Sequence, residues 1–500
     1  MKKFKVLHVG NIANNAYLNS KFLREKGIQA DVLCYDYYHI MATPEWEDAE
    51  IIGDWGDDYN PNWSKCKLGT FARPEWFFQG ELNDIGKKTF KWQNNDYLLN
   101  RLDTSLLVNR FNGFVRTRFW ATIIAILNFY TWSSSLCKIK PIEETLEFLT
   151  DISISYLDWA RRQLLPPAIR CRQEKFNSLY YKSLIKDFRL YFPERKDKLS
   201  MKDILIFLGR IDLLKHIFKN YDIIQAYASD PIFALLTNKH PYVAFEHGTL
   251  RDLPFEDSSL GRLTALAYRK ADLVFITNPD NINAAKRLGL NNSTYIPHPI
   301  DESKTNEKNR KQNLKKKLGV DYLFFAPARQ NWEIKGNDIV ISGYNLFVKQ
   351  NPSLKSQLIL ADWGDDTKKT KRLIKSLKME NKIIWVKALF RKKLRHYFQE
   401  SDVILDQFKG YFGAIAPEAM LFKKPVVTWF DKQLYDWAFK KMPPVILAKN
   451  SQEIANSLEK LVKNNKYYRS VSLDCHKWYK EYHSQRVVTE KLLKAYKEFL

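Results

Sequence analysis

Two cations flank a short loop in the second half of the chain, where they could neutralise a diphosphate. Arg329 directly follows an expected strand at residues 322–328, and Lys335 comes six residues later, just before an expected helix at residues 337–350. The free N–H groups at the start of such a helix also attract anions. A lone Arg or Lys is usually a solvated charge, but these three features at one mouth of a sheet predict a diphosphate-binding site.

A second loop could bind the rest of such a ligand. After an expected strand at residues 402–408, the stretch GYFGAIAPEAM places Gly410 and Gly413 in a tight loop, followed by a helix with Glu418 in its first turn. Glycines allow backbone amides to approach a ligand closely, and a carboxylate can accept a pair of hydroxyl groups. Alone, such a loop is often only a turn, and such a glutamate commonly serves the helix dipole.

Alternating strands and helices must position these loops. A strand-helix-strand unit opens the chain at residues 4–35, and the alternation resumes at about 203–301 and again at 322–463. This pattern predicts an α/β fold of two Rossmann-like, doubly wound domains that face each other across a cleft. We expect an N-terminal domain over residues 1–302 with a large, mostly helical insertion at about 36–200, and a C-terminal domain over 303–470. A helical tail, 471–500, is expected to pack back on the N-terminal domain.

The composition indicates a basic protein of a reducing compartment. The formal net charge of +24 implies an anionic partner, such as a phosphorylated small molecule, nucleic acid or an acidic membrane surface. The five cysteines are scattered without a CxxC pair, and the apolar start at residues 4–9 is too short for a signal peptide. We therefore expect a cytoplasmic protein.

One apolar run raises the question of membrane contact. Residues 119–132 follow Arg116 and Arg118, and they are fewer than the ~20 residues that a spanning helix needs. A buried helix is the favoured interpretation, and the alternative is an element lying peripherally on an anionic membrane surface.

With its loops in this order, the chain resembles the GT-B glycosyltransferases, in particular the retaining family 4 group. The resemblance covers the first strand unit, residues 222–301 and nearly all of 322–500, and it does not account for the insertion. It implies that Arg329 and Lys335 bind the diphosphate of a nucleotide sugar, and that Glu418 holds the ribose. It further implies that the loop at Phe412, Gly413 and Ala414 presents backbone amides to the donor sugar.

The resemblance also assigns two residues of the N-terminal domain. His247, at the end of an expected strand at residues 242–248, matches the family's histidine near the transferred sugar. Gly10 matches the first-loop glycine that approaches the phosphates. His247, Arg329 and Lys335 are therefore the expected catalytic residues.

One position departs from the family's motif. The family usually has a glutamate eight residues before the second one, and Gly410 stands there in this chain. The carboxylate that contacts the sugar is thus missing or replaced by a neighbour such as Asp406. The identity of the donor sugar therefore stays open.

The expected reaction is the transfer of a sugar to a hydroxyl of a glycan or lipid-linked acceptor, with retention of configuration. The cleft offers cations for a leaving diphosphate and no second carboxylate of the kind that hydrolases use. The resemblance implies a nucleotide-sugar donor and no cofactor or metal. Two alternatives stay open, a basic nucleic-acid-binding protein or DNA-modifying sugar transferase, and a catalytically silent GT-B-like scaffold.

The sequence DWGDD occurs twice, at residues 54–58 and 362–366, and three carboxylates around a glycine could hold a divalent cation. Because the contexts of the two copies differ, two acidic turns are the favoured interpretation. The first copy lies in an aromatic region in which Trp55 and Trp63 could stack on a sugar acceptor. An aromatic loop packed on the insertion is an equal alternative.

Overall fold

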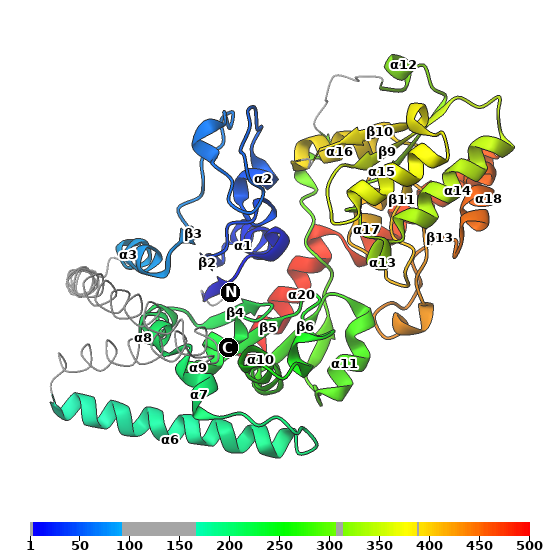
Figure 1. The fold of residues 1–500 in the computed structure, drawn as a ribbon. Coiled ribbons are helices and arrows are strands. Elements are labelled where there is room, and N and C mark those ends of the chain that lie inside the picture. The colour runs from blue at the N-terminus through cyan, green and yellow to red at the C-terminus, as the bar shows by residue number, and fades with distance from the viewer. Residues whose placement is uncertain (1–3, 93–166, 307–313, 388–389) are drawn as a thin grey trace, which may run out of the picture.

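The computed structural model describes residues 4–92, 167–306, 314–387 and 390–500, which form two α/β domains (Figure 1). Each domain is built on one parallel sheet with helices packed against it. Parallel sheets are buried on both faces, which explains why their strands are nearly continuous apolar runs in the sequence. The apolar run at residues 119–132 lies outside the described residues.

The N-terminal sheet has seven parallel strands in the order β3-β2-β1-β4-β5-β6-β7. Its strands are β1 (Lys5–Val9), β2 (Gln29–Tyr35), β3 (Phe77–Gly80), β4 (Ile223–Tyr227), β5 (Tyr242–Phe245), β6 (Leu273–Ile276) and β7 (Ser293–Tyr295). Part of the expected insertion belongs to this sheet, because β3 pairs with β2 at its edge, with Val32 opposite Phe77. Sequence alternation missed β3, since this four-residue strand follows a long irregular loop.

Helices cover both faces of this sheet. Along β1, Leu7 and Val9 face one apolar core, whereas Val6 faces the other. This is the two-residue period of a strand. The helices are α1 (Asn15–Glu25), α2 (Pro44–Asp48), α3 (Leu82–Trp92), α6 (Pro167–Tyr191), α7 (Met201–Leu205), α8 (Leu208–Phe218), α9 (Pro231–Leu236), α10 (Ser259–Lys270) and α11 (Ile282–Arg287).

The C-terminal sheet has six parallel strands in the order β10-β9-β8-β11-β12-β13. They are β8 (Tyr322–Ala326), β9 (Ser356–Ala361), β10 (Ile383–Val386), β11 (Val403–Leu405), β12 (Val426–Thr428) and β13 (Ile446–Leu447). The helices are α12 (Leu314–Leu318), α13 (Trp332–Lys335), α14 (Asn337–Gln350), α15 (Thr367–Ser376), α16 (Arg391–Glu400), α17 (Ile415–Leu421), α18 (Ser451–Lys463) and α19 (Asn465–Tyr482).

The last helix, α20 (Gln485–Lys497), crosses back to the N-terminal domain (Figure 1). Val488, Leu492 and Tyr496 are buried in the same core as residues of β1 and α1. The Tyr496 hydroxyl donates to Gln225 Oε1 of β4 at 2.6 Å. The chain thus passes between the domains twice, once before α12 and once between α19 and α20.

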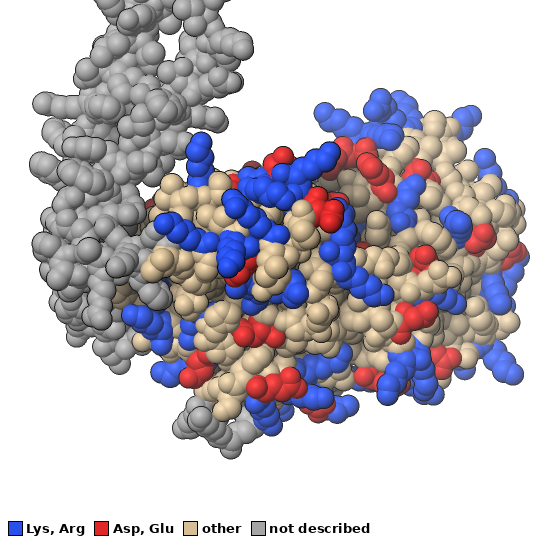
Figure 2. Space-filling model, turned by 90° about the horizontal axis from the view of Figure 1, so that it is seen from below, with Lys and Arg blue, Asp and Glu red and all other residues tan. Residues whose placement is uncertain are grey.

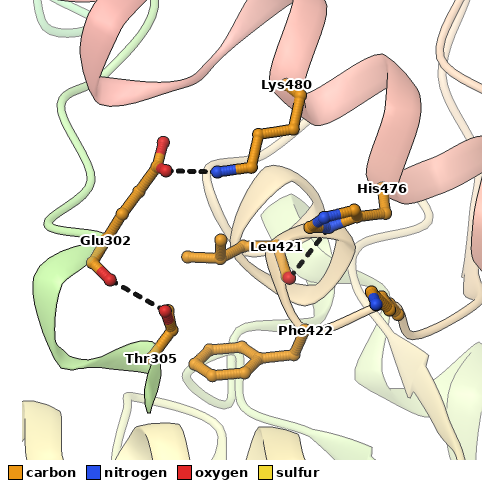
Figure 3. A pocket seen from close by; sticks show the side chains of 7 residues that line it. Glu302, Thr305, Leu421, Phe422, His476 and Lys480 are labelled. Carbon is orange, nitrogen blue, oxygen red and sulfur yellow. Dashed lines mark hydrogen bonds and ion pairs between the residues drawn. The ribbon is translucent and has the colours of Figure 1, made fainter.

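Glu302 ties these two crossings together. Its Oε1 accepts the backbone N–H of Gln485 at 2.8 Å and the Tyr479 hydroxyl at 3.1 Å, and its Oε2 pairs with Lys480. A hollow of about 400 Å³ lies beside this contact. In Figure 3, Lys480 reaches over it towards Glu302, and His476 Nδ1 donates to the carbonyl of Leu421. The hollow lies where the chain crosses between the domains, because its walls are the linker before α12, the end of α17, and α19.

No helix among the described residues is long and apolar enough to cross a membrane.

We expect α20 to contribute strongly to the stability of the N-terminal domain. Leu492 is fully buried, so Leu492→Ala should lower the free energy of unfolding by about 2–5 kcal/mol through lost burial and a cavity. Denaturant unfolding monitored by circular dichroism measures this loss. Lys494→Ala, on the exposed side of the same helix, is the matched control. Equal stability of both variants would contradict the docking of α20.

Candidate functional site

Arg329 and Lys335 lie at the carboxyl end of β8, on either side of a short loop. Lys335 is the last residue of α13, and its Nζ donates to Gln407 Oε1 at 2.6 Å. The backbone carbonyl of Lys335 also accepts the N–H of Phe408 at 2.9 Å, so the loops after β8 and β11 are joined. Gly336 then caps α14 in a left-handed conformation with φ 70°.

The environment of Lys335 is rich in positive charge. Burial lowers the pKa of Lys335, the nearby Asp406 carboxylate raises it, and Arg329 and Arg251 lower it further. Arg251 comes from the loop after β5 in the other domain. Lys335 thus lies near one further cation from each domain and near Asp406, and Arg251 has its own counter-charges in Asp280 and Glu246. Cations that converge at one site favour an anion.

Asp406 lies at the end of β11 and is buried beside the second glycine of the loop. Burial raises the pKa of Asp406 to about 6, while Lys335 and the backbone amides of Ala416 and Gly413 lower it. A Cβ on Gly413 would lie 2.9 Å from Gln407 Nε2 and 3.0 Å from Asp406 Oδ2. Gly413 therefore lets the loop close tightly over the carboxylate.

The backbone explains why residue 410 is a glycine. Gly410 has φ 96°, and an added Cβ would lie 3.1 Å from the Trp429 ring. A glutamate there would meet both the left-handed conformation and the ring. The departure from the family's motif is thus built into the loop, and Asp406 is the nearest preceding carboxylate in the sequence.

Glu418 lies in the first turn of α17 and is buried. Its Oε2 accepts from Arg391 Nη1 at 2.7 Å. Its Oε1 is buried and has no hydrogen-bond partner among the described residues. One carboxylate oxygen therefore keeps its capacity to accept a hydrogen bond.

On the opposite wall, His247 follows β5 and contacts a second histidine through Asn15. Asn15 Nδ2 lies 3.0 Å from His247 Nδ1, and Asn15 Oδ1 lies 3.3 Å from His298 Nδ1. Since the amide nitrogen donates and the amide oxygen accepts, His247 carries its proton on Nε2 and His298 on Nδ1. Burial, and then Arg251, lower the pKa of His247 to about 4, so the ring is neutral at pH 7.

His298 is a site neighbour that the sequence pattern does not reveal, because its partner comes from a distant element. The rings of His247 and His298 are 4.9 Å apart. His298 also lines a cavity of about 20 Å³ with Phe412, Gly413 and Ala414 of the C-terminal domain. Such a cavity has room for about one water molecule. The domains are therefore in close contact here.

Gly10 follows β1 and faces Asp230, which follows β4. With φ 85°, Gly10 has a conformation that favours glycine, and a Cβ there would lie 2.3 Å from Asp230 Oδ2. Burial raises the pKa of Asp230 to about 7, and Arg210 opposes the shift. No recognisable motif surrounds Asp230 in the sequence, but its position after a parallel strand is a signal that could have identified it.

Further contacts close one rim of the cleft. Arg251 pairs with Asp280 at 2.9 Å and lies 5.1 Å from the ring centre of Tyr411 in the other domain. Trp437 Nε1 donates to the carbonyl of Pro279 at 2.9 Å. The glycine loop is thus held against the N-terminal domain.

The carboxylates of the two DWGDD copies accept hydrogen bonds in different settings. In the first copy, Asp57 Oδ1 accepts the N–H of Tyr59 at 2.6 Å within its own turn. In the second, Asp366 Oδ2 accepts the N–H of Trp332 at 2.7 Å. Gly364 packs on the backbone of Gln330, where a Cβ would lie 2.5 Å from the carbonyl oxygen. The second copy therefore supports the loop that carries Arg329.

Trp55 and Trp63 are half-buried and contact an apolar cluster that joins the domains. Their ring centres are 6.5 Å apart. The cluster includes Trp46 and Ile51 of the N-terminal domain and Phe390 of the C-terminal domain. This packing accounts for the aromatic loop without a ligand.

Positive charge is spread over the face of the molecule that Figure 2 shows. Figure 2 shows lysine and arginine side chains on both domains of one face, with aspartate and glutamate side chains between them. Nucleic-acid-binding surfaces are typically stripes or patches of one sign. This face gives no specific support to nucleic-acid binding.

Asp230 should make stability depend on pH. Its pKa of about 7 in the folded protein lies above the ordinary 3.8, so the folded state holds its proton longer. Asp230 therefore costs stability as the pH rises from about 4 to 7, and the cost stays constant above that range. Asp230→Asn should gain up to roughly 2 kcal/mol relative to the wild type at pH 8 and little at pH 4.

Thermal unfolding of both proteins across this pH range tests the prediction. Asp212→Asn, at an exposed position on α8, should show no such pH-dependent gain. A gain for Asp230→Asn that is the same at every pH would contradict it.

Comparison with known proteins gives a family match in the C-terminal domain. Residues 305–474 match the family model described as "Glycosyl transferases group 1". The comparison with curated proteins found no match.

Solved structures are similar to 58–63% of this chain. Anabaena HepE, solved in complex with UDP and glucose, has a TM-score of 0.50 and 19% identity, over 58% of this chain and 82% of that chain. Sucrose-phosphate synthase from Thermosynechococcus elongatus has a TM-score of 0.46 and 13% identity, over 58% of this chain and 78% of that chain. A UDP-forming α,α-trehalose-phosphate synthase from Burkholderia xenovorans has a TM-score of 0.46 and 14% identity, over 63% of this chain and 85% of that chain. The chain has the GT-B fold, with two Rossmann-like domains, and its residues 305–474 match the glycosyl transferases group 1 family model.

Proposed function

We propose that this chain is a glycosyltransferase that moves a sugar from a nucleotide-diphosphate sugar to a hydroxyl of a glycan or lipid-linked acceptor. One observation carries the proposal. Arg329 and Lys335 flank the loop after β8, and Arg251 of the other domain lies close enough to lower the pKa of Lys335. Cations that converge from two domains suit a diphosphate that is bound between them.

The other donor contacts come from the loops around this clamp. Glu418 accepts the ribose hydroxyls through its free Oε1, which is buried and has no partner among the described residues. Phe412, Gly413 and Ala414 present their backbone to the donor sugar, and Gly10 leaves room for the phosphates. Asp406, beside Lys335 and Gly413, takes the place of the missing glutamate as the carboxylate that contacts the sugar.

The chemistry depends on the leaving group. Negative charge builds on the diphosphate as the glycosidic bond breaks, and Arg329 and Lys335 stabilise it there. The acceptor hydroxyl attacks from the face that the diphosphate leaves, and a phosphate oxygen takes its proton, so the configuration is retained. His247, held neutral with its proton on Nε2, donates a hydrogen bond to the sugar beside the reacting carbon.

The substrates can be proposed only by class. Because the HepE structure contains UDP, we take UDP-sugars as the first donors to test. Trp55 and Trp63 are candidates for acceptor contact at the edge of their apolar cluster. We place the protein in the cytoplasm, lying peripherally on an anionic membrane, where it could reach a lipid-linked acceptor.

The clamp residues should act as a unit. Arg329→Ala or Lys335→Ala should each cost on the order of 2–4 kcal/mol of transition-state stabilisation, a 10²- to 10³-fold loss of turnover. The double variant should lose less than the sum, since both cations serve the same charge. Donor turnover and donor affinity measured for the three variants test this.

Lys371→Ala is the matched control, because Lys371 lies on α15 of the same domain and pairs with Asp362. It should turn over donor like the wild type. Normal turnover in either clamp variant would mean that the donor site lies on other residues.

The reaction should not need a divalent cation. Asp57→Asn and Asp365→Asn, one in each DWGDD copy, should leave activity close to the wild-type level in the presence of EDTA, since both residues have turn or loop contacts that Asn can keep. Turnover assays in EDTA measure this. Strict dependence on added Mg²⁺ or Mn²⁺ would refute it.

A further inference from the structure

A buried ion cluster joins the two domains directly behind Glu418. Arg391 of α16 contacts Glu418 Oε2 through Nη1 at 2.7 Å, and its Nε lies 3.2 Å from Glu47 Oε2 of α2. Arg395 Nη2 contacts the other oxygen of Glu47 at 2.6 Å. The side chains are 1–10% exposed. Two arginines thus balance two glutamates out of contact with water.

The surroundings hold this cluster in one geometry. Trp46, next to Glu47 in the chain, lies beneath the Arg391 guanidinium, whose carbon is 5.4 Å from the ring centre. Phe390, next to Arg391, is buried in the apolar cluster with Trp46. The planar guanidinium therefore lies over a ring, donates to Glu418 through Nη1, and is held on its Nε side by the charge of Glu47.

Arg391 is shared between the two carboxylates. Its Nε lies 3.2 Å from Glu47 Oε2 as an ion pair without a hydrogen bond, and its Nη1 donates to one oxygen of Glu418, so Glu418 Oε1 keeps its lone pairs. Without the charge of Glu47, Arg391 would be free to turn and to bind both oxygens of Glu418, because bidentate pairing is the preferred arrangement of these groups. The free acceptor would then be lost.

We propose that Glu47, a residue of the N-terminal domain, is a positioning residue for the donor ribose, which it controls through Arg391 and Glu418. The proposal rests on the function proposed above, in which Glu418 accepts the ribose hydroxyls. It gives the segment before β3 a role in donor binding. By linkage, a bound ribose strengthens the contact between α2 and α16, so donor binding favours the domain arrangement described here.

The test compares ligands that differ only at the ribose. Isothermal titration measures the binding of UDP, 2′,3′-dideoxy-UDP and inorganic pyrophosphate to the wild type and to Glu47→Gln. If the wild type prefers GDP or ADP, that nucleotide and its dideoxy form replace UDP. We expect Glu47→Gln to weaken UDP binding on the order of tenfold, and to leave dideoxy-UDP and pyrophosphate binding unchanged.

Glu50→Gln is the matched control. Glu50 also joins the segment after α2 to α16, through Lys392 at 3.1 Å, but this pair is exposed. The Glu50→Gln variant should bind all three ligands like the wild type, because exposed ion pairs contribute little to stability. If Glu47→Gln does not fold, the double variant Glu47→Gln/Arg395→Gln removes one charge of each sign and keeps the buried cluster neutral. It should show the same loss confined to UDP.

The outcomes separate this inference from the proposed function. Wild-type affinity of Glu47→Gln for UDP, or equal losses for UDP and pyrophosphate, would overturn the role of Glu47. The proposed function stands in both cases if the wild type binds UDP more tightly than dideoxy-UDP and Glu418→Ala abolishes that preference. A wild type that binds none of the nucleotides would instead overturn the proposed function.

Discussion

The direction of the strands is the constraint on which the site depends. In both sheets the strands are parallel, so their carboxyl ends all lie at the same end of the sheet. The short loops that follow them can therefore place polar groups next to one another. Six residues of the candidate site lie in the loops that directly follow strands. They are Gly10 after β1, Asp230 after β4, His247 after β5, His298 after β7, Arg329 after β8, and Asp406 after β11. Most of these strands are buried and largely apolar, so the first polar side chains stand where the strands end.

Burial gives these polar groups their chemical character. His247 is neutral because protonation in a buried site beside Arg251 is unfavourable, and Asn15 fixes which ring nitrogen carries the proton. Burial and neighbouring cations lower the pKa of Lys335, and burial raises the pKa of Asp406. A bound diphosphate would offset the repulsion among the cations, so donor binding and the closeness of the domains should support each other.

Contacts between the domains lie on two sides of the cleft. On one side, Arg251 and Pro279 contact the loops that follow β11 and β12, and on the other, Glu47 contacts two arginines of α16. The double crossing at Glu302 joins the domains at their hinge. Any opening of the cleft must therefore break charged contacts on both rims, unless it turns about one of them.

The sequence by itself determined the two α/β domains, most of their strands, and the loops with Arg329, Lys335, Gly413 and Glu418. These features follow from local pattern, because buried parallel strands are apolar runs and ligand loops come after them. The tertiary structure decided what depends on contacts between distant segments: that β3 joins the sheet, that Asn15 links His247 to His298, and that Arg391 holds Glu418 against Glu47. It also supplied the reason for Gly410, since Trp429 fills the space that a side chain would need. No periodicity encodes such pairs, because their partners lie up to several hundred residues apart and meet only when both sheets have packed.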